Sequence, residues 1–147
     1  MEFYGDYHVH SGNSDARQSE KDIMDEAKRK GLKEVAITDH GPLAAIIGIK
    51  SPQEYRKIKS RVQNHNGIDP QVNVLVGAEA NIRDLNGRLD IPAEIIQELD
   101  ILIAGLHPYT LPTSIKDGYG IFVQNSLRHL SKGQKQKARN NNTKASI

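Results

Sequence analysis

The sequence predicts an α/β fold built on a parallel sheet. Short apolar segments alternate with segments of helical spacing along the 147 residues. The repeat is about 30 residues long, as expected for βα units joined by right-handed crossovers. Both an open doubly wound sheet and part of a βα barrel fit this order. In either arrangement, ligands gather at the carboxyl ends of the strands.

Four segments read as strands. They cover residues 3–9, 34–38, 72–78 and 101–106, and each is short, apolar and rich in Val or Ile. Such runs are typical of strands that are covered on both faces of a parallel sheet.

The helical segments between the strands have recognisable ends. The first begins at Ser19, a good N-cap, and ends at Gly31, whereas the second begins with Ser51-Pro52. A third starts near Pro92, after an Asn-Gly pair that indicates a short hairpin or loop excursion, and a fourth covers residues 121–130. Their expected buried faces are Ile23, Met24 and Ala27; Tyr55, Ile58 and Val62; Ile95, Ile96 and Leu99; and Val123, Leu127 and Leu130.

The composition limits which metal ligands and nucleophiles the chain can offer. The chain is 37% hydrophobic and 26% charged, as in a globular protein, and it contains no cysteine. A disulfide framework, a thiolate zinc site and a cysteine nucleophile are therefore excluded, so a metal would be held by histidine and carboxylate. The first residues lack a secretory signal, and no apolar run approaches the roughly 18 residues that span a bilayer. We therefore expect a cytoplasmic protein without a membrane partner.

Charge divides the chain in two. Residues 1–117 hold 14 Lys/Arg and all 18 Asp/Glu, a net charge of −4, whereas residues 118–147 hold 6 Lys/Arg and no acid. We expect one domain over residues 1–130 and a flexible, solvated basic tail over residues 131–147. The tail has no interleaved aromatic residues, which disfavours a nucleic-acid patch.

Potential metal ligands follow each expected strand. Singly, a histidine in such a place is often a turn or surface residue, but a lone buried carboxylate after an apolar run needs a partner. The shared placement at one end of every strand favours a common site. The candidates are His8, His10, Asp15, Asp39, His40, Glu79 and His107, whereas His65 and His129 lie in helical segments and read as surface residues.

Imidazole and carboxylate ligands suit zinc, manganese or iron. Without Asp39, six candidates remain, which is more than one tetrahedral zinc with an open position can use, and Glu79 could bridge two ions. Ions about 3.5–4 Å apart suit phosphoester hydrolysis, because they generate hydroxide at neutral pH and polarise phosphoryl oxygens. A separate catalytic base is then not required.

Four motifs in order carry a family resemblance. HVHSGNSD, ITDHGP, GAEANI followed by NGRLD, and LDILIAGLH together resemble the PHP (polymerase and histidinol phosphatase) superfamily of metal-dependent phosphoesterases, from Tyr7 to His107. Within it, the chain is most similar to the small stand-alone phosphatases and somewhat similar to the PHP exonuclease modules of X-type polymerases. The resemblance implies a distorted (β/α)7 TIM-like barrel with up to three divalent ions, of which this chain supplies the first four to five βα units.

The resemblance also implies roles for single residues. His8 and His10 would bind the first ion, Asp15 and His40 the second and His107 the third, while Glu79 would bridge and Asp39 would orient a ligand. Glu79 and Asp39 are thus the expected catalytic residues. Arg17, Lys50 and Arg83 are the candidates for holding the substrate phosphate.

The chain departs from the family at its far end. Members continue to a further strand ending in His-Pro and to an Asp-x-His motif, and this sequence has neither after His107. The expected barrel would stay open and expose a strand edge that favours self-association.

Three functional hypotheses follow. The first is a metal-dependent phosphatase that acts on a small phosphomonoester through metal-bound hydroxide. The second is a nucleic-acid-processing module of the exonuclease type. The third is a truncated, non-catalytic fragment that holds fewer ions.

Overall fold

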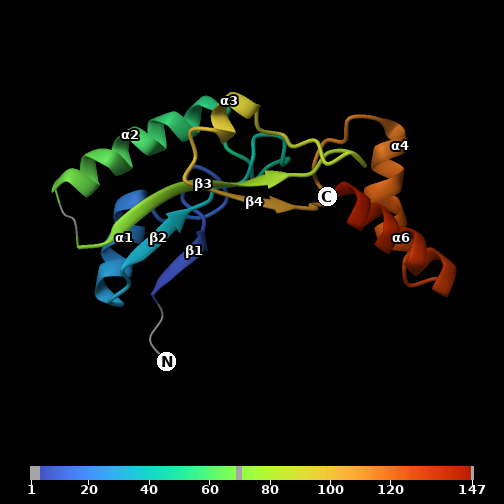
Figure 1. Cartoon of the computed structure of the whole chain (residues 1–147), viewed down its shortest axis with the longest axis horizontal. Coiled ribbons are helices and arrows are strands. Elements are labelled where there is room, and N and C mark those ends of the chain that lie inside the picture. The colour runs from blue at the N-terminus through green and yellow to red at the C-terminus, as the bar shows by residue number, and fades with distance from the viewer. Residues whose placement is uncertain (1–3, 69–70, 147) are drawn as a thin grey trace.

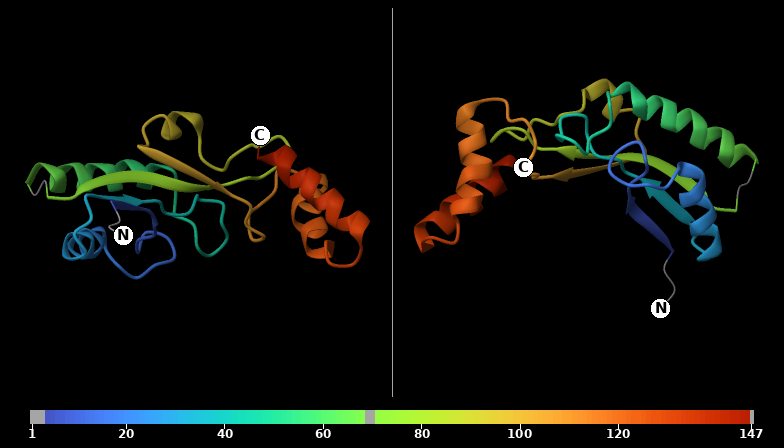
Figure 2. Two further views of the ribbon diagram at one scale, coloured as in Figure 1. Left: turned by 60° about the horizontal axis from the view of Figure 1, so that its bottom comes forward. Right: turned by 180° about the vertical axis from the view of Figure 1, so that it is seen from behind.

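The computed structural model describes residues 4–68 and 71–146, so Phe3 of the first expected strand and Ile147 lie outside the described residues. Four strands form one parallel sheet in the order β1-β2-β3-β4 (Figure 1). They are β1 (Gly5–Val9), β2 (Glu34–Ile37), β3 (Asn73–Asn81) and β4 (Ile101–Gly105). The sheet curls like part of a barrel wall (Figure 2). This confirms the predicted α/β class and the partial TIM-like barrel.

Strand β3 joins the two halves of the sheet. Its residues 73–76 pair with β2, and its residues 77–81 pair with β4. It runs three residues further than the sequence predicts, so Glu79 and Asn81 belong to the strand itself. Glu79 pairs with Ile103 of β4 and forms an isolated bridge with His40, which follows β2. Glu79 therefore sits in the interior of the sheet.

Strand β1 pairs with β2 through a shifted register. Asp6 is opposite Val35 and Val9 is opposite Ile37, so β1 has one extra residue between these pairs. Such bulges turn side chains to new directions and are common beside functional sites. His8 lies in this irregular part of β1.

Two helices cover the sheet as the sequence predicts. Helix α1 (Glu20–Arg29) begins with a capping box between Ser19 and Asp22. After α1, Gly31 adopts a φ of 71°, a left-handed conformation that ends helices. Helix α2 (Gln53–Ile68) packs against β3, and α1 packs against β2 (Figure 1). The predicted apolar faces of both helices are buried: Ile23, Met24 and Ala27 in α1, and Tyr55, Ile58 and Val62 in α2.

The third helical segment is much shorter than expected. Helix α3 (Ala93–Ile96) is a single turn in which Ile95 is buried, while Ile96 and Leu99 are half-buried. It ends early because Asp100 is tied to β3: its N–H donates to the Val76 carbonyl at 2.8 Å, and its carboxylate accepts from the Val76 N–H at 2.9 Å. The chain must therefore turn straight into β4.

The Asn-Gly pair forms the predicted excursion after β3. The N–H of Arg83 donates to the Arg88 carbonyl at 2.8 Å, and Ile82 bridges Leu89. Gly87 has a φ of 77°, which a glycine adopts without strain.

The fourth helical segment differs from its prediction in both bounds and face. It comprises α4 (Ile115–Gly118), the π-helical turn η1 (Tyr119–Val123) and α5 (Gln124–Leu127). The π turn inserts an extra residue and rotates the face. Gly120 and Ile121 are consequently buried, whereas Val123 and Leu130 are exposed.

Residues 132–145 form helix α6 (Lys132–Ala145), where the sequence predicts a solvated tail. The Ser131 hydroxyl caps it by accepting from the Gln134 N–H. Ala138 and Ala145, seven residues apart, are both buried, and the Asn141 side chain donates to the Gly120 carbonyl at 2.9 Å. Two alanines make too narrow a stripe for the hydrophobic pattern to be recognised. The expected boundary between the domain and the tail at residue 130 stays a prediction.

These last helices lie beyond the carboxyl ends of β3 and β4 (Figures 1 and 2). Ile82, Ile121 and Ala145 form a small second core there, apart from the main core beneath α1, α2 and α3. Among the described residues, no helix is both long and apolar enough to cross a bilayer.

Candidate metal centre

Glu79 of β3 is surrounded by four imidazoles. Its Oε2 atom lies 3.2 Å from His8 Nε2, 3.2 Å from His10 Nε2 and 3.1 Å from His40 Nδ1. Its Oε1 atom lies 3.1 Å from His107 Nε2. These side chains come from the carboxyl ends of all four strands. The structure thus brings the expected ligands of four separate motifs to one carboxylate.

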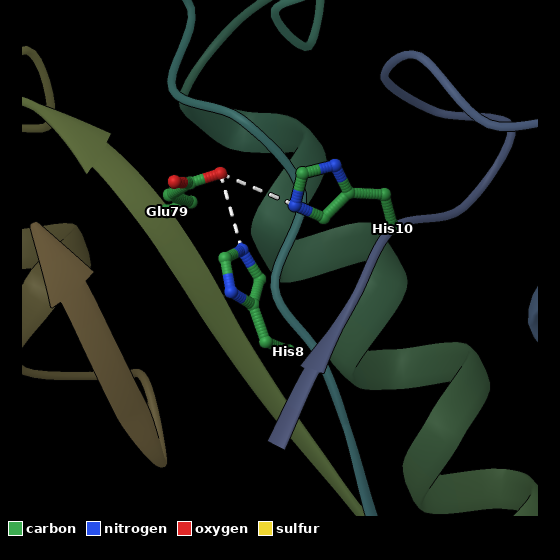
Figure 3. Close-up of side chains that lie close together, drawn as sticks. All are labelled: His8, His10 and Glu79. Carbon is green, nitrogen blue, oxygen red and sulfur yellow. Dashed lines mark ion pairs between the residues drawn. The ribbon is translucent and has the colours of Figure 1, made fainter. Parts of the chain in front are cut away.

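His8 and His10 reach the same oxygen of Glu79 from β1 and the residue that follows it (Figure 3). Side chains at i and i+2 of a strand point to one face, which explains the shared direction. His8 is half exposed at the rim, while the side chain of His10 keeps only 18% of its surface accessible.

Asp15 lies between His10 and His40. Its Oδ1 is 2.8 Å from His10 Nδ1, and its Oδ2 is 3.7 Å from His40 Nε2. Because the carboxylate only accepts, His10 Nδ1 is the donor, which turns the lone pair of His10 Nε2 towards Glu79. Asp15 could therefore orient His10, contribute an oxygen to an ion, or do both.

His107 stands two residues beyond β4, in contact with Gly105. A Cβ added at Gly105 would lie 2.5 Å from His107 Cε1 and 3.2 Å from Glu79 Oε1. The absence of a side chain at Gly105 makes room for the imidazole. The Tyr109 ring stacks on the His107 imidazole, with the ring centroids 5.5 Å apart and an angle of 2° between the ring planes.

The donor set fits a divalent cation. His10 Nε2 and His40 Nδ1 are buried without a hydrogen-bond partner, yet both face Glu79 Oε2. A buried polar atom left without a partner needs an explanation, and an ion between the imidazole and the carboxylate provides one. The atoms make three overlapping groups that could each hold an ion: His8, His10 and Glu79; His10, Asp15 and His40; and His40, Glu79 and His107.

The pKa values of the ionisable groups reflect this crowding. Burial lowers the pKa of His40, and the neighbouring His10 and His107 add to the effect, against the attraction of Glu79. For Glu79, burial alone would raise the pKa, but the hydrogen bond from His8 and the charges of His40 and His107 bring it below the usual value. The lowered pKa values therefore favour the neutral imidazole of His40 and the ionised carboxylate of Glu79, which are the forms that bind metal.

Asp39 does not face the cluster. It is fully buried, and it accepts hydrogen bonds from the Ser11 N–H at 2.6 Å, the Ser11 hydroxyl at 2.7 Å and the Ser14 hydroxyl at 2.6 Å. These donors belong to the loop between His10 and Asp15. Asp39 thus fastens the loop that carries a candidate ligand, and its partners are not the histidines themselves.

Two of the three candidate phosphate contacts lie at the surface, and Arg83 is half-buried. Arg17 and Lys50 are exposed. The Nε of Arg83 donates to the Leu111 carbonyl at 3.0 Å, which ties the excursion after β3 to the loop after His107. His65 and His129 lie outside the three groups that could hold an ion.

Two residues beside the site, Asn81 and Asp90, were not predicted from the sequence. Asn81 lies 2.7 Å from the Nδ1 atom of His107 and contacts the Asp90 carboxylate. A signal for Asn81 was present, because it stands two residues after Glu79 on the same face of β3. Asp90 gives no local signal, since its contact depends on how the excursion folds back.

Comparisons with known proteins agree with this geometry. Residues 6–146 match the PHP domain family. A probable phosphatase of Shewanella frigidimarina (strain NCIMB 400) is 36% identical over 128 residues, which are 86% of this chain and 49% of the relative. A probable phosphatase of Citrobacter koseri is 37% identical over 103 residues, 69% of this chain and 40% of the relative. The chain thus spans about half the length, or less, of these curated relatives.

The family match covers almost the whole chain, and it includes every residue that lines the cluster. This chain therefore belongs to the PHP domain family.

Proposed function

We propose that this chain contributes the metal centre of a metal-dependent phosphoesterase that acts on small phosphomonoesters. The observation that carries the proposal is the position of Glu79, whose two oxygens face four imidazoles from the ends of four strands. The relatives' description as probable phosphatases supports the reaction class.

The residues present fit divalent zinc, manganese or iron. Clustered ions of this kind lower the pKa of water and polarise a phosphoryl group when they are bound. The chain's own part is to hold and orient: His8 and His10 in the first group, Asp15 and His40 in the second, His107 in the third, with Glu79 shared between two groups. Asp39 keeps the loop before Asp15 in place.

The surface around the site favours a small substrate. Residues 1–117 carry a net charge of −4, so the body of the protein lacks the positive field that a polynucleotide would require. Arg17, Lys50 and Arg83 are the proposed contacts to the phosphate, because each lies in a loop that follows a strand.

The test is hydrolysis of p-nitrophenyl phosphate by the purified chain with added Mn²⁺ or Zn²⁺. Glu79→Gln should lower the rate by about 100-fold or more, since changes to residues that merely orient metal ligands already cost about 10–100-fold. His65→Gln and His129→Gln are matched histidine controls outside the three groups and should keep the wild-type rate.

Two results would contradict the proposal. A wild-type chain that binds ions without hydrolysing any phosphomonoester would support the non-catalytic hypothesis. Hydrolysis of single-stranded DNA in preference to phosphomonoesters would support the exonuclease hypothesis.

Light scattering of the same sample tests self-association through the edge of the sheet, which a monomer would exclude.

A further inference from the structure

The side chain of Asn81 is fully buried and makes four hydrogen bonds. Its Oδ1 lies 2.7 Å from His107 Nδ1 and 3.0 Å from the Thr110 hydroxyl. Its Nδ2 lies 2.6 Å from Asp90 Oδ2 and 3.4 Å from the Gly41 carbonyl. The amide thus connects a candidate metal ligand on one side with a buried carboxylate on the other.

The orientation of this amide is fixed by Asp90. Asp90 Oδ1 accepts from the Asn81 N–H at 2.8 Å, and its Oδ2 accepts from the Leu43 N–H at 3.0 Å. The Gly41 carbonyl is likewise only an acceptor. The NH₂ group of Asn81 must therefore face Asp90 and Gly41, so its oxygen must face His107.

This orientation decides the tautomer of His107. An amide oxygen only accepts, so His107 Nδ1 must carry the proton. A neutral imidazole has one N–H, which leaves the lone pair on Nε2, the atom 3.1 Å from Glu79 Oε1. A lone pair that faces a carboxylate oxygen at this distance is unfavourable without a cation between them.

Gly41 allows Asp90 to approach. A Cβ at Gly41 would overlap both carboxylate oxygens of Asp90. The glycine of the Asp39-His40-Gly41 motif therefore makes room for a residue that follows it by 49 positions in the sequence. Two segments that are separate in the sequence thus meet at the Asn81 amide, and neither Gly41 nor Asp90 is among the candidate ligands.

We propose that Asn81, held by Asp90, is a positioning residue that fixes the Nδ1–H tautomer of His107 and presents Nε2 to the group of His40, Glu79 and His107. This inference rests on the proposed metal centre. It adds an element that the ligand set does not contain: a neutral amide whose direction is set by Asp90, a carboxylate outside the three groups that could hold an ion.

The direct test reads the tautomer in the full chain without metal. Long-range ¹H–¹⁵N correlation spectra of histidine-labelled protein, at about pH 8.5, where ordinary imidazoles are neutral, distinguish protonated from unprotonated ring nitrogens. The His107 signal is assigned by its loss in His107→Gln. We expect the proton on Nδ1 in the wild type and a mixture of tautomers in Asn81→Ala.

Asn66→Ala is the matched control. The Asn66 side chain makes two hydrogen bonds, both to the backbone of Val74, and neither involves a histidine. This variant should lose stability but keep the wild-type tautomer. Asp90→Asn is the second variant, and it serves if Asn81→Ala does not fold. An amide at position 90 can donate to Asn81, so the orientation of Asn81 is no longer fixed and both tautomers should appear.

Ion binding, measured by calorimetric titration with Mn²⁺, is the second readout. Asn81→Ala should weaken one class of site by about 10–100-fold, whereas Asn66→Ala should leave the affinities unchanged. Wild-type protein that binds ions but carries the His107 proton on Nε2, or an Asn81→Ala variant with the wild-type tautomer, would overturn the inference while the proposed function stands. A wild-type chain that shows the Nδ1 proton but binds no ion would overturn the proposed function, and the tautomer assignment would hold.

Discussion

Gly105 and His107 lie so close that the imidazole occupies the space a side chain at Gly105 would need. A Cβ at Gly105 would be 2.5 Å from His107 Cε1 and 2.9 Å from its Nε2. The glycine that ends β4 is therefore part of the candidate metal centre, although it offers no ligand atom.

The first prediction concerns this contact. Gly105→Ala should displace His107 from Glu79 and lower the free energy of unfolding by about 1–3 kcal/mol, the usual effect of overpacking. Urea denaturation and Mn²⁺ titration measure the two effects. Gly67→Ala is the control, because nothing lies within 4 Å of a Cβ there and an alanine inside α2 should raise the stability by up to about 1 kcal/mol. Equal changes in unfolding free energy and in Mn²⁺ affinity for the two variants would contradict the steric argument.

The second prediction concerns Asp39. Asp39→Ala removes the acceptor of three hydrogen bonds from Ser11 and Ser14, so the free energy of unfolding should fall by about 3 kcal/mol. The loosened loop should also weaken ion binding at the group that contains Asp15. Asp25→Ala removes an exposed ion pair with Lys21 and should change the stability by less than about 1 kcal/mol. Unfolding curves and ion titrations of both variants provide the comparison.

The third prediction concerns pH. Burial raises the pKa of Glu20, but hydrogen bonds from Arg61 and Asn13 outweigh it, and the net pKa lies below the usual 4.5. Since a lowered folded pKa stabilises the fold above the unfolded pKa, this contribution should disappear as the pH falls through the folded pKa. The stability difference between wild type and Glu20→Gln should therefore be constant above about pH 5.5 and shrink below about pH 4.5. A stability difference that is absent above about pH 5.5 would argue against the Arg61 and Asn13 contacts.

The fourth prediction concerns metal removal. An ion that binds only the folded chain stabilises it by about 2.7 kcal/mol at a free concentration of 100 times its dissociation constant. Addition of Mn²⁺ should raise the melting temperature, and a chelator should reverse the rise. Glu79→Gln should abolish the shift, whereas His129→Gln should retain it. If the melting temperature changes with neither Mn²⁺ nor the chelator, the chain does not bind these ions in its folded state.

The strands and most ligand positions were predictable because both depend on local patterns. Strands β2, β3 and β4 are rich in Val, Ile or Ala, and each candidate ligand lies within a few residues of the carboxyl end of its strand. The order of elements was therefore enough to place His8, His40 and His107 at one edge. The two long helices were equally clear, because their caps and apolar faces agree with each other.

The features that the sequence did not predict depend on contacts between residues that are distant in the sequence. Asp90 meets Asn81 only after the excursion folds back, and Asp100 shortens α3 by binding to β3. The π turn rotated the buried face away from Val123 and towards Ile121. Helix α6 was not predicted because it packs through alanine and asparagine side chains and has no large apolar stripe.

The central position of Glu79 also bears on how the chain unfolds. Ions bound at this carboxylate would cross-link His8 to His107, 99 positions later in the sequence, through ligands at the ends of four different strands. Strand β1 could then separate from β4 only after ion release. The loaded chain should therefore resist unfolding kinetically, as chains with long-range covalent bridges do.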